Sequence, residues 1–208
     1  MADKIAEILL KIEAVQLRTN PPFRWVSGIL SPIYTDNRLL MGHVKERTFI
    51  INEFVRLIKK NKIEFDGFAG TATAGIPWAS WLAMKMEKPM VYIRNQSKDH
   101  GKENLIEGRI ESGKTYIVVE DLISTGQSSI NTINALREKG VNVEHCIAIF
   151  TYELEKSIEN FSNANVNLLT LTNFTNFVKT ALDKKNITKN QLNHIMDWKK
   201  HPEGWVAV

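Results

Sequence analysis

Two adjacent carboxylates, Glu120 and Asp121, follow an apolar run in the segment TYIVVEDLISTGQSS, which spans residues 115–129. An isolated carboxylate costs several kcal/mol to bury, so this pair is expected where a strand leaves the core and meets water or a ligand. Hydroxyl-bearing and small residues come next, at Ser124, Thr125 and Gly126. The segment therefore predicts a polar site at the end of a buried strand.

The residues after the acid pair suit an anion. They separate a predicted strand at 115–120 from a predicted helix at 126–139, and backbone amides in a tight turn before a helix form a concavity that suits a phosphate group. The carboxylates would repel a phosphate, but vicinal sugar hydroxyls can donate hydrogen bonds to them. The combination predicts a ribose 5-phosphate site with Mg²⁺ nearby. An ordinary helix cap behind an acidic strand end is the alternative.

Two further segments could complete such a site. GTATAGIP, residues 70–77, offers a second set of amides between a predicted strand and a predicted helix. RNQSKDHGKEN, residues 94–104, contains no apolar residue, and its cations could bind several anionic oxygens. Because this polar segment lies between two predicted strands, we expect a lid over the site. A solvated charged loop is the alternative.

One motif match is misleading. GRIESGKT, residues 108–115, fits the phosphate-loop pattern G-x-x-x-x-G-K-[ST]. That motif requires a helix to begin at its Lys-Thr pair, whereas Lys114 and Thr115 run into the predicted strand YIVVE. We therefore interpret the match as accidental.

The order of elements predicts an α/β fold. Strands alternate with helices, which indicates a mostly parallel sheet covered on both faces, and runs such as YIVV and CIAIF suit strands buried on two sides. Ligands collect beyond the carboxyl ends of such strands, where the acid pair lies. The expected elements are helices at 3–16, 43–60 and 126–139, an extended segment at 23–38, strand-loop-helix at 66–86, strands at 90–94, 115–120 and 143–150, and a strand and two helices after 166.

Composition limits the class of protein. The chain has 208 residues, of which 43% are hydrophobic, enough for one large domain spanning residues 1–208. Its formal charge of +4 comes from scattered cations, and the one cysteine, Cys146, suits a reducing compartment. The N-terminus places acids among its apolar residues, and no apolar stretch approaches membrane-spanning length. We expect a soluble cytoplasmic protein.

The segment VVEDLISTGQSS resembles the ribose-phosphate signature of type I phosphoribosyltransferases. Together with SGILSPIYTDNR, GTATAGIP and RNQSKDHGKEN followed by IEG, it makes the chain similar to the orotate phosphoribosyltransferases from about Ile5 to about Phe150. The resemblance implies the type I phosphoribosyltransferase fold, in which helices flank a central, mostly parallel sheet. It also implies a small N-terminal subdomain, the hood, contributed mainly by residues 1–40.

The same resemblance implies an activity and its residues. The reaction would be the Mg²⁺-dependent transfer of ribose 5-phosphate from phosphoribosyl pyrophosphate (PRPP) to N1 of orotate, giving orotidine 5′-phosphate and pyrophosphate in pyrimidine synthesis. Mg²⁺ would be held mainly by substrate and water, and a homodimer would share its active sites through the lid. The implied catalytic residues are Lys98, His100 and Asp121. The implied PRPP-binding residues are Arg94, Lys98, His100, Glu120, Asp121, Leu122, Ile123, Ser124, Thr125, Gly126, Gln127 and Ser128.

For orotate, the resemblance implies Ser124, and Arg38 is our candidate partner of the orotate carboxylate, with a surface salt bridge as its alternative. The chain departs from the family on this side. Many members carry lysine at Val26 or Leu30 and at Ala74, a second basic residue at Asn95, and an arginine near Tyr152. A phosphoribosyltransferase for another base therefore stays open, as does a non-catalytic regulator that binds nucleic acid. The cations Lys98 and His100 of the expected lid favour an enzyme over a regulator. We expect neither a nucleic-acid partner nor a membrane partner.

Overall fold

A six-stranded sheet forms the centre of the computed structural model, which describes residues 2–25, 28–94 and 105–206. Its strand order is β10-β9-β8-β5-β6-β7, and the neighbours pair in parallel except for the antiparallel β6 and β7. The predicted mostly parallel sheet is therefore confirmed. The strands are β5 (Gly67–Thr71), β6 (Met90–Ile93), β7 (Ile106–Glu107), β8 (Thr115–Ile123), β9 (Asn142–Thr151) and β10 (Asn167–Asn173).

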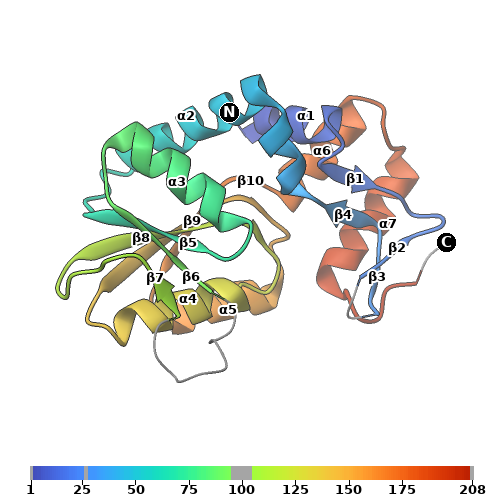
Figure 1. The fold of residues 1–208 in the computed structure, drawn as a ribbon. Coiled ribbons are helices and arrows are strands. Elements are labelled where there is room, and N and C mark those ends of the chain that lie inside the picture. The colour runs from blue at the N-terminus through green and yellow to red at the C-terminus, as the bar shows by residue number, and fades with distance from the viewer. Residues whose placement is uncertain (1, 26–27, 95–104, 207–208) are drawn as a thin grey trace.

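Helices cover both faces of this sheet (Figure 1). One face carries α3 (Gly75–Met86), with α2 (Val44–Lys60) and α1 (Ala2–Lys11) beside it, and the other carries α4 (Gln127–Arg137) and α5 (Glu155–Asn163). Strand β8 shows why its sequence is continuously apolar: Ile117 and Val119 enter one core cluster, and Val118 enters the other. In the described part of the chain, no helix combines the length and the apolar character needed to cross a bilayer.

The two ends of the chain pack together beside the sheet (Figure 1). Trp198 donates a hydrogen bond from Nε1 to the carbonyl oxygen of Leu30 over 3.1 Å, and its ring lies 5.4 Å from that of Trp25. The C-terminal helices thus lie against the short N-terminal strands. The elements of this lobe are β1 (Val15–Leu17), β2 (Phe23–Arg24), β3 (Leu30–Ser31), β4 (Ile33–Thr35), the 3-10 helix η1 (Asn37–Gly42), α6 (Phe174–Asp183) and α7 (Lys189–Lys200).

Most predicted elements are present, with one correction at the N-terminus. The helix expected over 3–16 ends at Lys11, because Glu13 adopts a left-handed φ of 57° and Val15 pairs with Thr35 in the β1–β4 ribbon. Val15 therefore packs in the core from a strand, and Ile12 packs against the core from the turn after α1. Helix α5 and strand β7 were not predicted. Thr115 begins β8, so no helix starts at the Lys-Thr pair of GRIESGKT. This confirms that the match to the pattern G-x-x-x-x-G-K-[ST] is accidental.

Candidate active site

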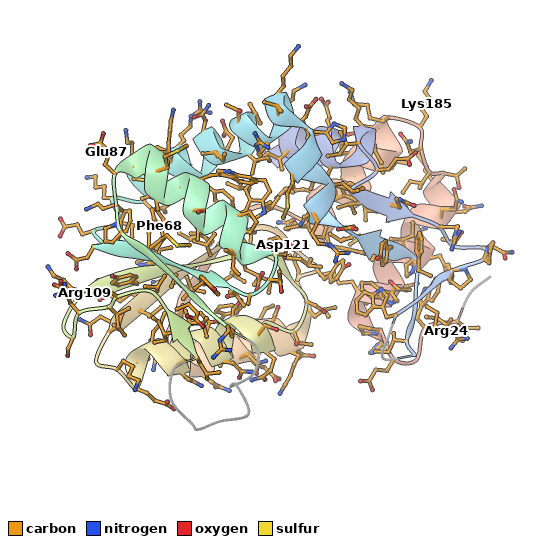
Figure 2. The ribbon with its side chains drawn as sticks, in the orientation of Figure 1. Arg24, Phe68, Glu87, Arg109, Asp121 and Lys185 are labelled. Carbon is orange, nitrogen blue, oxygen red and sulfur yellow. The ribbon has the colours of Figure 1, made fainter. Side chains whose placement is uncertain are left out.

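The acid pair and both glycine-bearing loops meet in one cavity of about 260 Å³. Its lining comes from residues 72–74, which follow β5, from residues 120–122 near the carboxyl end of β8, and from residues 124–129, which follow β8. Asp121 lies where the sheet approaches the neighbouring lobe (Figure 2). Of the predicted sugar-phosphate segment only Ile123 is absent from this lining; its side chain is 1% exposed and packs in the core. The expected convergence of the two loops is therefore present.

Residues 124–128, called the phosphate loop below, lead into α4. Gly126 is the N-cap of this helix, with φ of +78°, and no side chain at the N-cap accepts a hydrogen bond within the described structure. The first amides of a helix have no partner within it, and the helix dipole places partial positive charge there. An anion such as a phosphate would satisfy these donors.

The second loop brings backbone close to the acid pair. A Cβ added to Gly75, the first residue of α3, would collide with the carbonyl oxygen of Val119 in β8. Only glycine allows α3 to start this close to the strand. Ala72, Thr73 and Ala74 consequently face the phosphate loop across the same cavity.

The two carboxyl groups lie in an environment that disfavours their charge. Glu120 is 6% exposed, and its Oε1 accepts a hydrogen bond from the amide of Asp121 over 3.1 Å. Burial, together with the neighbouring charge of Asp121, raises the pKa of Glu120 well above its ordinary value. Burial also raises the pKa of Asp121, against the opposing effects of its hydrogen bond with Glu120 and, to a smaller extent, of the Arg38 charge. Hydroxyl donors or a cation entering the cavity would stabilise the ionised pair.

Arg38 reaches the edge of this site already paired. Its Nε and Nη2 donate to the two carboxylate oxygens of Asp36 over 2.6 and 3.0 Å, and 64% of its side chain is exposed. The structure thus shows the surface salt bridge that was the alternative reading of this residue. An orotate carboxylate would have to replace Asp36 as the partner of the guanidinium.

A second cavity, of about 280 Å³, adjoins the first. Ser128 lines both, and Arg94 lines the second together with Asn131 and Thr132. Arg94 lies 3.2 Å from Glu107, measured from Nε to Oε1. Lys98 and His100, which were predicted to belong to a lid, lie outside the described residues. Arg94 directly follows β6 and, through the second cavity, lies next to the phosphate loop.

The structure describes three of the positions where the chain departs from the family, namely Leu30, Ala74 and the surroundings of Tyr152. Ala74 lines the cavity, and Leu30 belongs to β3; Val26 and Asn95 lie outside the described residues. Tyr152 is 3% exposed and stacks on Trp25 with ring centroids 5.2 Å apart. A buried aromatic group thus occupies the region where many members carry an arginine.

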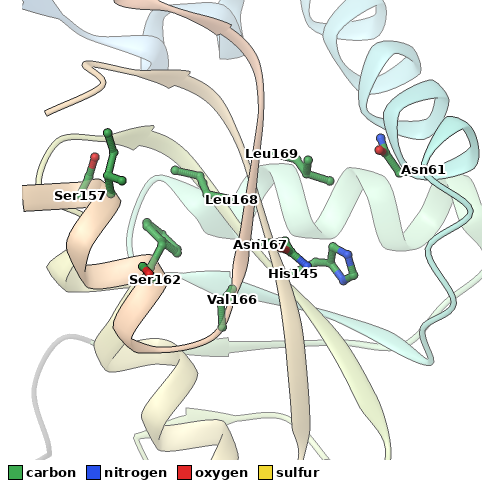
Figure 3. Close-up of a pocket in the computed structure, with 10 residues that line it drawn as sticks. Asn61, His145, Ser157, Ser162, Val166, Asn167, Leu168 and Leu169 are labelled. Atoms are coloured by element: carbon green, nitrogen blue, oxygen red, sulfur yellow. The ribbon is translucent and has the colours of Figure 1, made fainter. Parts of the chain in front are cut away.

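A larger cavity lies elsewhere in the described structure. A groove of about 560 Å³ lies between α5 and β10, with Asn61 and His145 at one side (Figure 3). None of the predicted site residues that the structure describes lines it. Size alone would have selected the wrong cavity, because the convergent amides and carboxylates lie in the smaller one.

Two asparagines touch the site from elements far away in the sequence. Asn37 Nδ2 donates to the carbonyl oxygen of Asp121 over 2.8 Å, and Asn160 Nδ2 donates to that of Thr125 over 2.9 Å. Their partners are 84 and 35 residues away. Asn37 stands in the segment SGILSPIYTDNR that carried the resemblance, but nothing in the sequence around Asn160 indicated a role.

Comparison with known proteins agrees with this geometry. Residues 43–185 match the family model of the phosphoribosyl transferase domain, which defines the class of protein. A relative from Coxiella burnetii, named orotate phosphoribosyltransferase, is 49% identical and the match covers 98% of each chain. One from Listeria innocua with the same name is 48% identical over 97% of each chain. The chain belongs to the orotate phosphoribosyltransferase family.

A solved structure agrees with both the fold and the family. The orotate phosphoribosyltransferase of Aeropyrum pernix superposes with a TM-score of 0.75 at 28% identity. The match covers 84% of this chain and 96% of that one. The central sheet and its helices are therefore those of a type I phosphoribosyltransferase.

Proposed function

We propose that this chain is an orotate phosphoribosyltransferase, which transfers ribose 5-phosphate from PRPP to N1 of orotate in the synthesis of pyrimidine nucleotides. One observation carries the proposal: a single cavity joins the uncapped N-terminus of α4 to two adjacent carboxylates. A phosphate group and a sugar diol on one molecule match these two features. The names of the full-length relatives support orotate as the acceptor.

Residues 124–128 would bind the 5-phosphate of the ribose through backbone amides and the hydroxyl groups of Ser124, Thr125 and Ser128. Glu120 and Asp121 would accept hydrogen bonds from the two ribose hydroxyls, which would favour their ionised forms. Both ends of the sugar phosphate would then be held. Fixing the reacting carbon in this way supplies part of the rate enhancement.

The leaving group needs positive charge on one side of the sugar. As the C1–oxygen bond to pyrophosphate breaks and the bond from N1 of orotate forms, negative charge builds on the departing oxygens, and the proton of N1 passes to water or to the departing pyrophosphate. Arg94, with Lys98 and His100 from the lid, would stabilise that charge and exclude water. Mg²⁺, held mainly by the substrate and water, would neutralise further pyrophosphate charge. The buried carboxyl group of Glu120 and the half-buried one of Asp121 fit a nearby cation, because it would lower their raised pKa values.

On the acceptor side, Ser124 would contact orotate, and Arg38 would exchange Asp36 for the orotate carboxylate. This exchange requires little reorganisation, since most of the Arg38 side chain is already exposed. A bidentate guanidinium–carboxylate pair would orient the planar base.

Three further features belong to the proposal. We expect one domain over residues 1–208, with a hood mainly from residues 1–40; the packing of Trp198 on Trp25 supports treating both chain ends as parts of that unit. We expect a homodimer in which the lid of one protomer completes the site of its partner. We also expect a cytoplasmic location, which the free, buried Cys146 supports.

The test is an assay with PRPP and Mg²⁺ in which orotate, uracil, hypoxanthine and adenine are offered separately and pyrophosphate release is followed. We expect release with orotate and background release with the other bases. A preference for another base would transfer the proposal to that base. No release with any base, together with salt-dependent binding to nucleic acid, would support the regulator.

A further inference from the structure

Helix α5 packs directly behind the phosphate loop. Asn160 donates a hydrogen bond to the carbonyl oxygen of Thr125, and the ring of Phe161 lies behind Gly126. We infer that Asn160 and Phe161 are positioning residues, which fix the peptide between Thr125 and Gly126 so that its amide can bind the phosphate of PRPP. The inference rests on the proposed function, since it assigns a role within the same site.

The geometry of the peptide unit links the hydrogen bond to the ligand. The peptide between Thr125 and Gly126 is trans, so its carbonyl group and its N–H point in opposite directions. Asn160 holds the carbonyl toward α5 with a donor–acceptor distance of 2.9 Å. The N–H of Gly126 therefore points away from α5, and both Thr125 and Gly126 line the cavity. A single side-chain donor behind the loop thus sets the direction of a phosphate-binding donor in front of it.

Phe161 restricts the same peptide by contact. A Cβ added to Gly126 would lie 2.7 Å from Cε2 of Phe161, and Gly126 has a φ of +78° that side chains disfavour. The ring is 3% exposed and belongs to the core cluster beneath α4. Glycine at this position is required both by the backbone conformation and by the ring. The ring also blocks movement of the loop toward α5.

The support is itself anchored. Arg137, in the last turn of α4, donates to the carbonyl oxygen of Ala164, at the end of α5, over 2.8 Å, and to that of Val143 over 2.6 Å. Helices α4 and α5 are thus joined near both ends, by Asn160 at the start of α4 and by Arg137 at its finish. Ser157 and Ser162, on the same helix, line the open groove between α5 and β10, and Phe161 lines it with them (Figure 3). The phosphate loop therefore rests on a helix that is fixed to the sheet.

Asn160→Ala and Asn160→Asp test the hydrogen bond, with Asn163→Ala as a matched control from an exposed position of the same helix. The measurements are KM for PRPP, KM for orotate, kcat, the Kd of ribose 5-phosphate by calorimetry, and Tm. For Asn160→Ala we expect KM for PRPP and the Kd to rise about fivefold, the size of one partly exposed hydrogen bond, with kcat and KM for orotate nearly unchanged. Asn160→Asp should have a larger effect, because a carboxylate repels the Thr125 carbonyl.

Phe161→Leu is the second variant and should raise KM for PRPP in the same way. A folded Asn160→Asp protein with the wild-type KM for PRPP would overturn the inference. The inference would also be overturned if kcat fell and both KM values rose by similar factors, in proportion to the drop in Tm. A contact that only stabilises the fold predicts that pattern. Either result leaves the proposed function in place. Wild-type protein that uses no PRPP would overturn the proposed function and, with it, this inference.

Discussion

Asn37 Nδ2 and the backbone carbonyl oxygen of Asp121 are joined by a hydrogen bond of 2.8 Å. Asn37 is fully buried at the start of η1, and the carboxylate of Asp121 belongs to the cavity at the end of β8. The position of the acid pair thus depends on an element from the neighbouring lobe. A change in that lobe can reach the sugar site without touching a ligand.

Asn37→Ala should therefore affect both stability and activity. Leaving the Asp121 carbonyl without this donor should cost about 1–3 kcal/mol of unfolding free energy, measured in urea, and should lower kcat/KM for PRPP. Asn61→Ala is the control, because Asn61 Nδ2 donates to the Leu57 carbonyl over 2.8 Å at the end of α2, away from the site. An equal loss of kcat/KM in both variants would show that the effect is not specific to Asp121.

Asp121→Asn should weaken the use of PRPP. The amide keeps the shape of the side chain but loses the charge that a ribose hydroxyl would meet, so we expect KM for PRPP to rise about tenfold or more. Steady-state kinetics with saturating orotate gives this value. Asp197→Asn, at a carboxylate that is 65% exposed and paired with Lys200, should change nothing. Unchanged kinetics in Asp121→Asn would remove Asp121 from the site.

Glu120→Gln should change how stability depends on pH. Burial raises the pKa of Glu120 above its ordinary value of 4.5, so the folded protein retains a proton that the unfolded chain has released. The favourable contribution is complete below about pH 4.5 and is lost as pH rises through the folded-state pKa. Thermal unfolding of ligand-free protein from about pH 4 to about pH 8 should show the variant gaining Tm relative to wild type as pH increases. A Tm difference independent of pH would contradict this expectation.

Gly126→Ala should destabilise the phosphate loop. The left-handed φ costs about 1–2 kcal/mol for alanine, and the contact with Phe161 adds to it. Combining it with Phe161→Leu should recover part of the loss, seen as a coupling energy in a double-mutant cycle of Tm and KM for PRPP. Gly42→Ala is the control, since a Cβ there meets no atom within 4 Å. If the effects of Gly126→Ala and Phe161→Leu on Tm and on KM for PRPP simply add in the double variant, the two residues are not coupled and the contact contributes nothing.

Lys98→Ala should lower kcat far more than it lowers Tm, because the lid would act on the leaving group and not on the core. If the lid crosses to the partner's site, mixing the impaired Lys98→Ala and Asp121→Asn proteins, assayed at a PRPP concentration well below the raised KM, should restore part of the activity. The assay is pyrophosphate release after subunit exchange has been verified with a fluorescent label. Absence of recovery despite exchange would count against shared sites.

The local parts of the site could be predicted from the sequence. The apolar run of β8, the acid pair at its end and the glycine before α4 are contiguous, so their order alone places the amides next to the carboxylates. The same local logic rejected GRIESGKT, whose Lys114 leads into a strand. Local spacing was less reliable at residues 12–16, where a strand position reproduced the apolar pattern of a helix.

Only the tertiary structure decided what surrounds those parts. Asn37 and Asn160 reach the backbone of Asp121 and Thr125 from other elements, and the ring of Phe161 lies behind Gly126. Such contacts depend on sheet order and on the packing of helices over both faces, which arise from the burial of the whole core. The sequence of a short segment determines which chemical groups that segment carries. The fold of the complete chain determines which distant hydrogen-bond donor or aromatic ring contacts it.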